Sequence, residues 1–170
     1  IRDCFPDPAC GEDIHDGSYF VERDYCTARQ LKRMAKTVRQ DGEPEYDVQA
    51  IAEVLKEGPK GRARDRERFR DTAGDAQKDS DVFEVFYYYG DVEPDTLIEM
   101  GVSLDTIRDE DLQLASVPAI VTMVNDRPIK AAVNPLETGE FPFDFFPWEP
   151  VEGQPWGRGI PRKMSVAQKM

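Results

Sequence analysis

Side chains that bind metals or act as nucleophiles gather near the start of the sequence. Cys4, Cys10 and His15 lie in one short segment, together with the four carboxylates of Asp3, Asp7, Asp13 and Asp16. Zinc sites usually combine two closely spaced ligand pairs, such as Cys-x-x-Cys, and this segment has neither pair. Its carboxylates also lack the alternating spacing and the glycine of a calcium-binding loop. We therefore expect an irregular loop here, with no metal ion and no cofactor.

An enzyme is the alternative function that these residues leave open. A small metal- or thiol-dependent enzyme would be built around Cys4, Cys10 and His15, and His15 is the one histidine of the chain. The cysteines number three, which does not suit a closed disulfide framework and indicates free thiols. No other spacing selects a phosphate loop or a pair of catalytic carboxylates. The sequence therefore favours a protein that is not an enzyme.

Charge is distributed unevenly along the chain, whose formal net charge is −12. Between Ser80 and Asp126 there are eleven acidic residues and one basic residue, Arg108, so this stretch alone carries −10. Such a segment repels phosphate and disfavours bulk binding of nucleic acid. We interpret it as a solvated acidic face.

A candidate basic patch precedes the acidic stretch and consists of alternating arginines, Arg62, Arg64, Arg66, Arg68 and Arg70. Blocks of mixed charge are usually solvated and poorly ordered, so a charged loop is favoured over a phosphate-binding site. Combined with the basic face of the helix expected after residue 27, the patch would give a third possibility, a nucleic-acid-binding module.

Two amphipathic helices are expected in the first third of the chain. Thr27 and Gln30 have the spacing of a capping box, and an apolar stripe follows as far as Val38. Asp47 can cap a second helix, and the pair Gly58-Pro59 is a typical stop.

Strand patterns follow the helices. Residues 82–89 are β-branched and aromatic, which predicts a strand. Residues 119–124 and 129–133 flank the turn Asn125-Asp126 and predict a hairpin. Pro128 places the second strand of that hairpin at a sheet edge.

Helices thus precede strands without βαβ alternation, which predicts an α+β fold. We expect two N-terminal amphipathic helices, then a mostly antiparallel sheet or hairpin region, and then an extended aromatic and proline-rich segment. One module would comprise a loop and helical part (1–59), a charged loop (60–80), a mainly β part (81–150) and the start of a truncated helix (151–170). Because the chain opens on Ile1 and stops just after a second capping-box spacing, Ser165 to Gln168, we expect a module excised from a longer protein.

The aromatic segment, residues 141–156, combines rings with several prolines, so it is extended without being a central strand. Its rings either cover the sheet of the same domain or form a surface that packs on another subunit, since aromatic residues are enriched at protein interfaces. The candidate contact residues are Phe141, Phe143, Phe145, Phe146, Trp148 and Trp156.

Several stretches, taken in order, resemble the portal proteins of tailed bacteriophages, in the form found in short-tailed phages and prophages. They are CFPDPACGEDIHDG at 4–17, YCTARQL at 25–31, YYYG at 87–90, Asn134-Pro135, FPF at 141–143, WGRGIP at 156–161, and Gln168. Each is weakly specific alone, and together they span nearly the whole chain.

The resemblance implies an internal segment of a portal subunit, the head–tail connector of the virion. Such subunits form a ring, usually of about twelve copies, through which the terminase drives DNA and on which tail and adaptor proteins assemble. DNA would pass through the channel without sequence-specific binding. The expected location is the virion and the cytoplasm of a bacterial host that carries the prophage. No membrane partner is expected, because no apolar run approaches the length that a bilayer requires.

Overall fold

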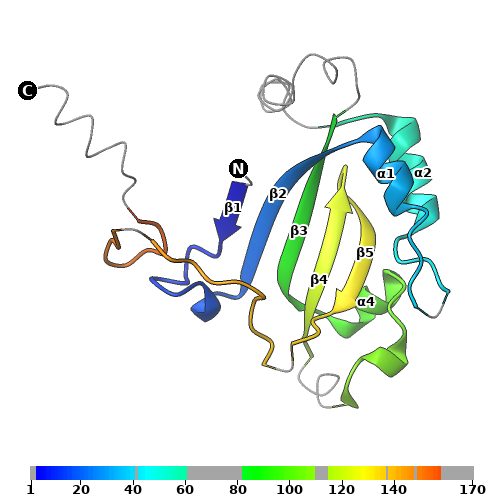
Figure 1. The fold of residues 1–170 in the computed structure, drawn as a ribbon. Coiled ribbons are helices and arrows are strands. Elements are labelled where there is room, and N and C mark those ends of the chain that lie inside the picture. The colour runs from blue at the N-terminus through cyan, green and yellow to red at the C-terminus, as the bar shows by residue number, and fades with distance from the viewer. Residues whose placement is uncertain are drawn as a thin grey trace, which may run out of the picture.

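The computed structural model describes residues 3–40, 42–60, 82–109, 115–136, 138–147 and 149–157. A five-stranded antiparallel sheet forms its centre, and the strands lie side by side in chain order (Figure 1). These strands are β1 (Asp3–Pro6), β2 (Tyr19–Thr27), β3 (Val82–Val92), β4 (Val117–Val124) and β5 (Arg127–Val133).

Helices are few and short. They are α1 (Ala28–Met34) and α2 (Val48–Glu57), which lie between β2 and β3, and α4 (Pro94–Glu99), which follows β3. Two 3-10 turns, η1 (Ile14–Asp16) and η3 (Leu104–Thr106), complete the regular structure of the described residues. No helix within these ranges is both long enough and apolar enough to cross a membrane.

The predicted α+β arrangement, with two N-terminal helices ahead of a hairpin region, is wrong. The sheet begins at β1, and both β1 and β2 precede α1 in the chain. After the two helices the chain returns as β3, which pairs with β2 over the whole length of β2. Charged residues in the middle of β2, Glu22, Arg23 and Asp24, interrupt its apolar pattern and conceal the full length of the strand in the sequence. In the sheet they are partly buried, and Arg23 forms an ion pair with Asp3 of the neighbouring β1. The fold is a mostly antiparallel sheet with few helices.

The local signals around the helices are confirmed. Thr27 and Gln30 form the reciprocal capping box at the start of α1. The Asp47 carboxylate accepts hydrogen bonds from the first N–H groups of α2, and Gly58 ends that helix with a φ of 77°. However, α1 stops before its apolar stripe does, because Val38 leaves the helix and forms an isolated bridge with Pro44.

The predicted hairpin forms around Asn125 and Asp126, whose φ values of 53° and 64° are those of a two-residue type I′ turn. Asn125 is buried, and its side chain ties the turn to the end of α2. Its Nδ2 donates to the Gly58 carbonyl at 2.7 Å, and its Oδ1 accepts from the Lys60 N–H at 3.1 Å. The turn residue therefore fixes both the hairpin and the helix that covers it.

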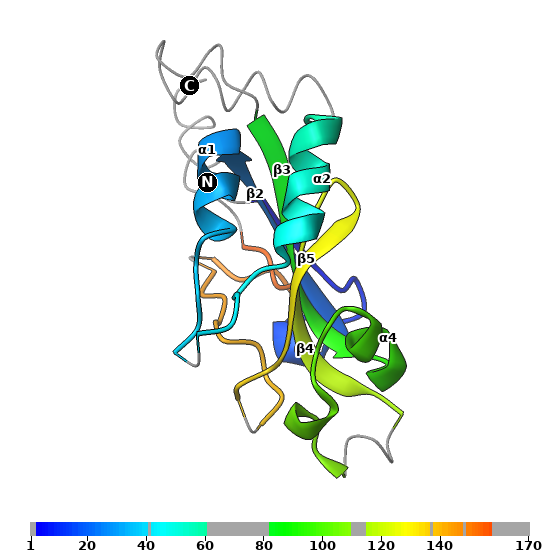
Figure 2. The same ribbon diagram turned by 90° about the vertical axis from the view of Figure 1, so that its right-hand side faces the viewer.

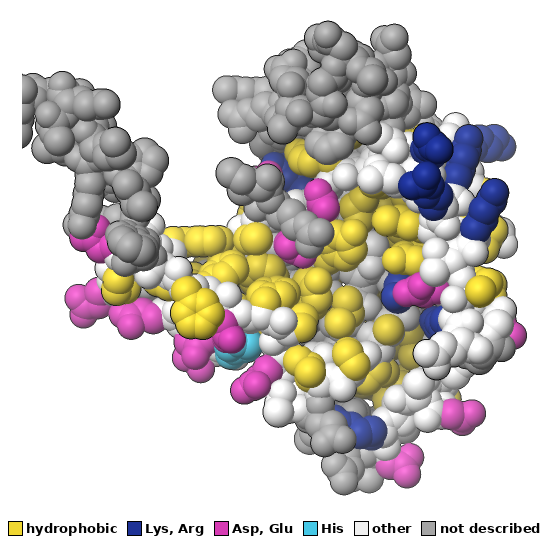
Figure 3. Space-filling view, viewed as in Figure 1, with side chains coloured by type: hydrophobic (Ala, Val, Ile, Leu, Met, Phe, Trp, Pro, Cys, Tyr) yellow, Lys and Arg dark blue, Asp and Glu magenta, His cyan; other side chains and the backbone are white. Residues whose placement is uncertain are grey.

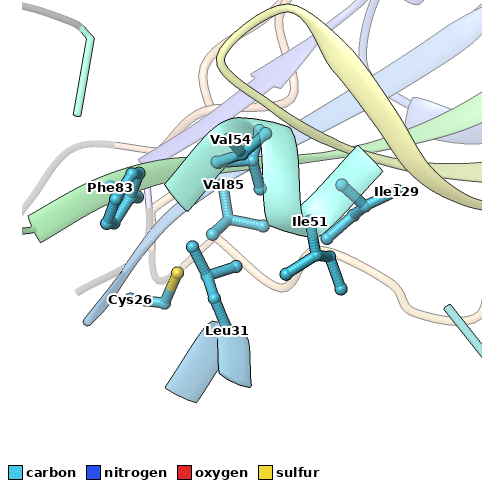
Figure 4. Packing of buried hydrophobic residues seen from close by; sticks show 8 residues of the cluster. Cys26, Leu31, Ile51, Val54, Phe83, Val85 and Ile129 are labelled. Atoms are coloured by element: carbon cyan, nitrogen blue, oxygen red, sulfur yellow. The ribbon is translucent and has the colours of Figure 1, made fainter. Parts of the chain in front are cut away.

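The first core cluster lies under α1 and α2, on what we call the front face of the sheet (Figure 4). Leu31 of α1 and Ile51 and Val54 of α2 meet alternate residues of β3, Phe83 and Val85. A register shift in the β4–β5 pairing leaves Ile129 unpaired with β4. This bulge lets Ile129 join the helix cluster while its neighbour Lys130 also reaches the α1–α2 loop.

The second core cluster lies on the back face, where α4 and the loop after it pack against β3, β4 and β5. Leu97 of α4 is fully buried there with Val117 and Val121 of β4. Figure 2 shows α1 and α4 on opposite sides of the sheet. The sheet is therefore covered on both faces, but by different and incomplete layers.

Candidate functional site

The aromatic segment crosses the front of the sheet and reaches past β1 (orange in Figure 1). Three of its rings pack around Phe20 of β2, which is 1% exposed. The ring centroids of Phe141, Phe143 and Phe145 lie 6.1, 4.6 and 5.5 Å from that of Phe20. Phe143 also meets Tyr89 edge-on at 5.2 Å. These rings form a third core cluster, so part of the segment covers the sheet of its own domain.

His15 joins the N-terminal loop to this segment. Its Nε2 lies 2.8 Å from Oδ1 of Asp144, and its Nδ1 accepts a hydrogen bond from the Phe141 N–H at 3.4 Å. Because Nδ1 accepts, Nε2 carries the hydrogen that is donated to Asp144. The ring also stacks on Phe141, with centroids 5.6 Å apart. The residue considered from sequence as a metal ligand or base thus holds the aromatic segment in place.

A second connection ties the far end of the segment to the same loop. The Gly153 N–H donates to the Glu12 carboxylate at 3.0 Å. Trp156 packs on Phe145, with ring centroids 5.1 Å apart. The chain between these connections is therefore fixed at both ends against the N-terminal loop.

Two aromatic side chains of this anchored segment are exposed. Phe146 is 90% exposed, and Trp156 is 44% exposed although it touches Phe145. Trp148 lies outside the described residues. The candidate contact residues thus divide into two groups. Phe141, Phe143 and Phe145 face the sheet, whereas Phe146 and Trp156 present apolar surface to solvent.

The N-terminal loop is organised by Asp7. Its carboxylate accepts hydrogen bonds from the N–H groups of Ala9 and Ser18, at 2.8 and 2.9 Å. These bonds, led by that from Ala9, lower the pKa of Asp7 below its usual range. A Cβ at Gly17 would lie 2.9 Å from Cβ of Asp7, so only glycine fits this close approach. This loop carries a local signal in the sequence, because an Asp often accepts a hydrogen bond from the backbone N–H two residues later, as Asp7 does from Ala9.

The three thiols are free in the structure. Cys10 and Cys26 are buried, and Cys4 is partly buried against the aromatic cluster. Burial is the main cause that raises the pKa of Cys10, and burial raises that of Cys26 to about 12. Among the described residues, no group of three or more His, Cys, Asp and Glu side chains could hold a metal ion. The enzyme alternative built on Cys4, Cys10 and His15 gains no support from this geometry.

The candidate basic patch, Arg62, Arg64, Arg66, Arg68 and Arg70, lies outside the described residues. A different basic surface is described on α1 and the turn after it (dark blue at the upper right of Figure 3). We call it the basic surface of α1. Its five members are exposed, and none of them forms an ion pair with a carboxylate of the described ranges. These members are Arg29, Lys32, Arg33, Lys36 and Arg39.

Two cations of β5 pair with carboxylates of the helical layer. Arg127 of β5 reaches Glu53 and Glu57 of α2 at 2.6 and 2.8 Å. Lys130 binds Glu45 at 2.6 Å and lies over the ring of Tyr46. Both cations hold the helical layer to the β5 edge. The described residues thus present two surfaces for contact with other molecules, an exposed aromatic pair and a basic surface without ionic partners in the described ranges.

Comparison with known proteins adds no relative to this description, since the chain matches no protein-family model and no curated protein sequence.

Proposed function

We propose that this chain is a structural part of a portal subunit of a tailed bacteriophage or prophage, which acts through contacts between subunits of a ring. The proposal is supported by the resemblance of the segments quoted above and by the surface chemistry of the described residues. In such a ring the partners are further copies of the subunit, the terminase that drives DNA inward, and the tail or adaptor proteins. The protein would be found in the virion and, before assembly, in the host cytoplasm.

The observation that carries the proposal is the exposure of Phe146. A phenylalanine that is 90% exposed leaves most of its apolar surface in water, although burial would stabilise it. Phe146 belongs to a segment that is held at both ends, so the ring is presented at a fixed place. Trp156 adds a second exposed aromatic side chain to the same segment. Fixed, exposed aromatic side chains are typical of the anchoring residues of protein interfaces.

The test is the assembly state of the natural protein, expressed in full. We expect rings with a central hole by negative-stain microscopy and a matching oligomer mass in solution. Phe146→Ser should reduce the ring fraction without lowering the thermal stability of the isolated subunit. Leu136→Ser is the control, because Leu136 is also exposed (40%) but lies outside the aromatic segment. A natural protein that stays monomeric at every concentration and salt would reject the portal proposal.

A further inference from the structure

The front face of the sheet has an apolar area that the described elements cover only in part. It lies between α1 and the aromatic segment and is visible as a yellow surface in Figure 3. Pairing register places Tyr87 of β3, Ile120 of β4 and Ala132 of β5 on this face, and all three are partly exposed. The basic surface of α1 borders the area. An apolar surface beside a cationic rim suits a partner that carries apolar side chains among carboxylates.

The back face of the same chain carries such a combination. Ile98 of α4 and Leu104 of η3 are exposed by 42% and 54%. Five exposed carboxylates flank these two residues in the sequence, and none of the five pairs with a cation of the described ranges. The carboxylates are those of Glu93, Asp95, Glu99, Asp105 and Asp109. We call these seven residues the acidic back patch. The chain thus displays a basic, apolar surface on one side of the sheet and an acidic, apolar surface on the other.

We propose that the front face binds the acidic back patch of a second copy of this chain. Because the two surfaces lie on opposite sides of one sheet, a copy bound at the front still offers its own front to the next copy. Such a heterologous contact builds a ring when the rotation between copies closes, and a twofold dimer cannot satisfy it. The inference rests on the proposed portal function and deepens it, since it identifies the two surfaces that meet between neighbouring subunits.

Charge reversal in the natural, full-length protein tests this pairing. One variant carries Arg29→Glu, Lys32→Glu and Lys36→Glu, and the other carries Glu99→Lys, Asp105→Lys and Asp109→Lys. Each variant alone would place like charges opposite each other at every contact. We expect each to need a protein concentration at least about tenfold higher for assembly. An equimolar mixture should restore assembly, because every contact between alternating copies then pairs opposite charges.

Lys56→Glu is the matched control, since Lys56 of α2 is exposed and has no ionic partner among the described residues. It should assemble as the unaltered protein does. Thermal unfolding of the isolated variants shows whether they remain folded, and recovery in the mixture shows it independently. Assembly of the unaltered protein should also weaken at about 1 M salt, where the screening length falls to about 3 Å.

Four results would overturn the inference. If the unaltered protein forms rings and both variants form them equally well, the head-to-tail pairing is wrong while the portal proposal stands. If folded variants fail to assemble even when mixed, the two surfaces do not contact each other. If the α1 variant assembles normally but loses salt-dependent DNA binding, the basic surface faces DNA. Absence of rings from the unaltered protein would reject the portal proposal and this inference together.

Discussion

Two phenylalanines three residues apart in the aromatic segment should behave in opposite ways. Phe143 is partly buried, and its ring lies 4.6 Å from that of Phe20 and 5.2 Å from that of Tyr89. Phe146 is 90% exposed and is absent from the buried aromatic cluster. We predict that Phe143→Ala destabilises the fold, whereas Phe146→Ala leaves the free energy of unfolding nearly unchanged and reduces assembly.

The expected magnitude follows from the buried area. A phenylalanine buries roughly 200 Å² when fully enclosed, so partial burial of Phe143 removes about 100 Å² from water. At roughly 25 cal/mol per Å² this contributes about 2.5 kcal/mol. The edge-on contacts with Phe20 and Tyr89 add to this value, and residual burial in the unfolded chain reduces it. We expect a loss of about 2–3 kcal/mol for Phe143→Ala and less than about 0.5 kcal/mol for Phe146→Ala.

Urea unfolding of the two variants, followed by far-ultraviolet circular dichroism, measures this difference. The slope of the unfolding free energy against urea should stay constant, so that the midpoints report stability. Limited proteolysis between residues 141 and 157 adds a local measurement, and only Phe143→Ala should accelerate cleavage there. Equal losses of stability in both variants would refute the division of the segment into an anchored and an exposed face. So would a stable Phe143→Ala protein that fails to assemble.

Three further predictions concern the loop, the turn and the thiols. Asn125→Ala should lower the free energy of unfolding by about 2–4 kcal/mol, because the variant loses two hydrogen bonds and alanine is strained at a positive φ. Asn125→Gly should cost less, because glycine adopts that φ without strain. Iodoacetamide at pH 8 should modify Cys4 in the folded protein and should modify Cys26 only after denaturant is added. The reason is that Cys26 is buried and its pKa of about 12 leaves almost no thiolate. Rapid modification of Cys26 in the folded protein would contradict its burial. Because the pKa of Asp7 is lowered in the folded protein, its ionised carboxylate stabilises the fold at pH values above 3.8, the ordinary pKa of the group. This stabilisation is lost as the pH falls through the folded pKa. Acid unfolding curves of Asp7→Asn should therefore show a smaller pH dependence than those of the unaltered protein.

Local signals in the sequence were sufficient where the interaction is local. The capping box of Thr27 and Gln30 joins neighbours in the chain, as does the capping of α2 by Asp47. The turn at Asn125 and Asp126 was likewise visible, because few residues accept a positive φ at two successive positions. Each of these features depends on side chains within a few residues of one another, so a single sequence displays them.

The full length of strand β2 and the role of His15 were not visible, because both depend on distant residues. Arg23 is tolerated inside a strand since Asp3 and Glu84, from the two neighbouring strands, lie within 4 Å of its guanidinium. His15 finds its partner Asp144 129 residues away. The sequence predicted an ordinary loop residue at His15, and it held no signal for the two hydrogen bonds by which His15 links that loop to the aromatic segment. Sequence reasoning also could not tell which rings of the aromatic segment face the sheet, since the segment lacks the strict alternation of a strand.

The order in which the chain leaves the ribosome has a consequence for Phe20. The meander from β1 to β5 joins neighbours in sequence and can assemble progressively, but the rings that cover Phe20 arrive with residues 141–145. Between the synthesis of Phe20 and that of Phe145 the ribosome adds 125 residues. At roughly 5–20 residues per second this takes about 6–25 seconds. During that interval Phe20 in a nascent sheet would lack three of the rings that cover it. It would then be a natural site for chaperone binding and for mispairing between neighbouring nascent chains.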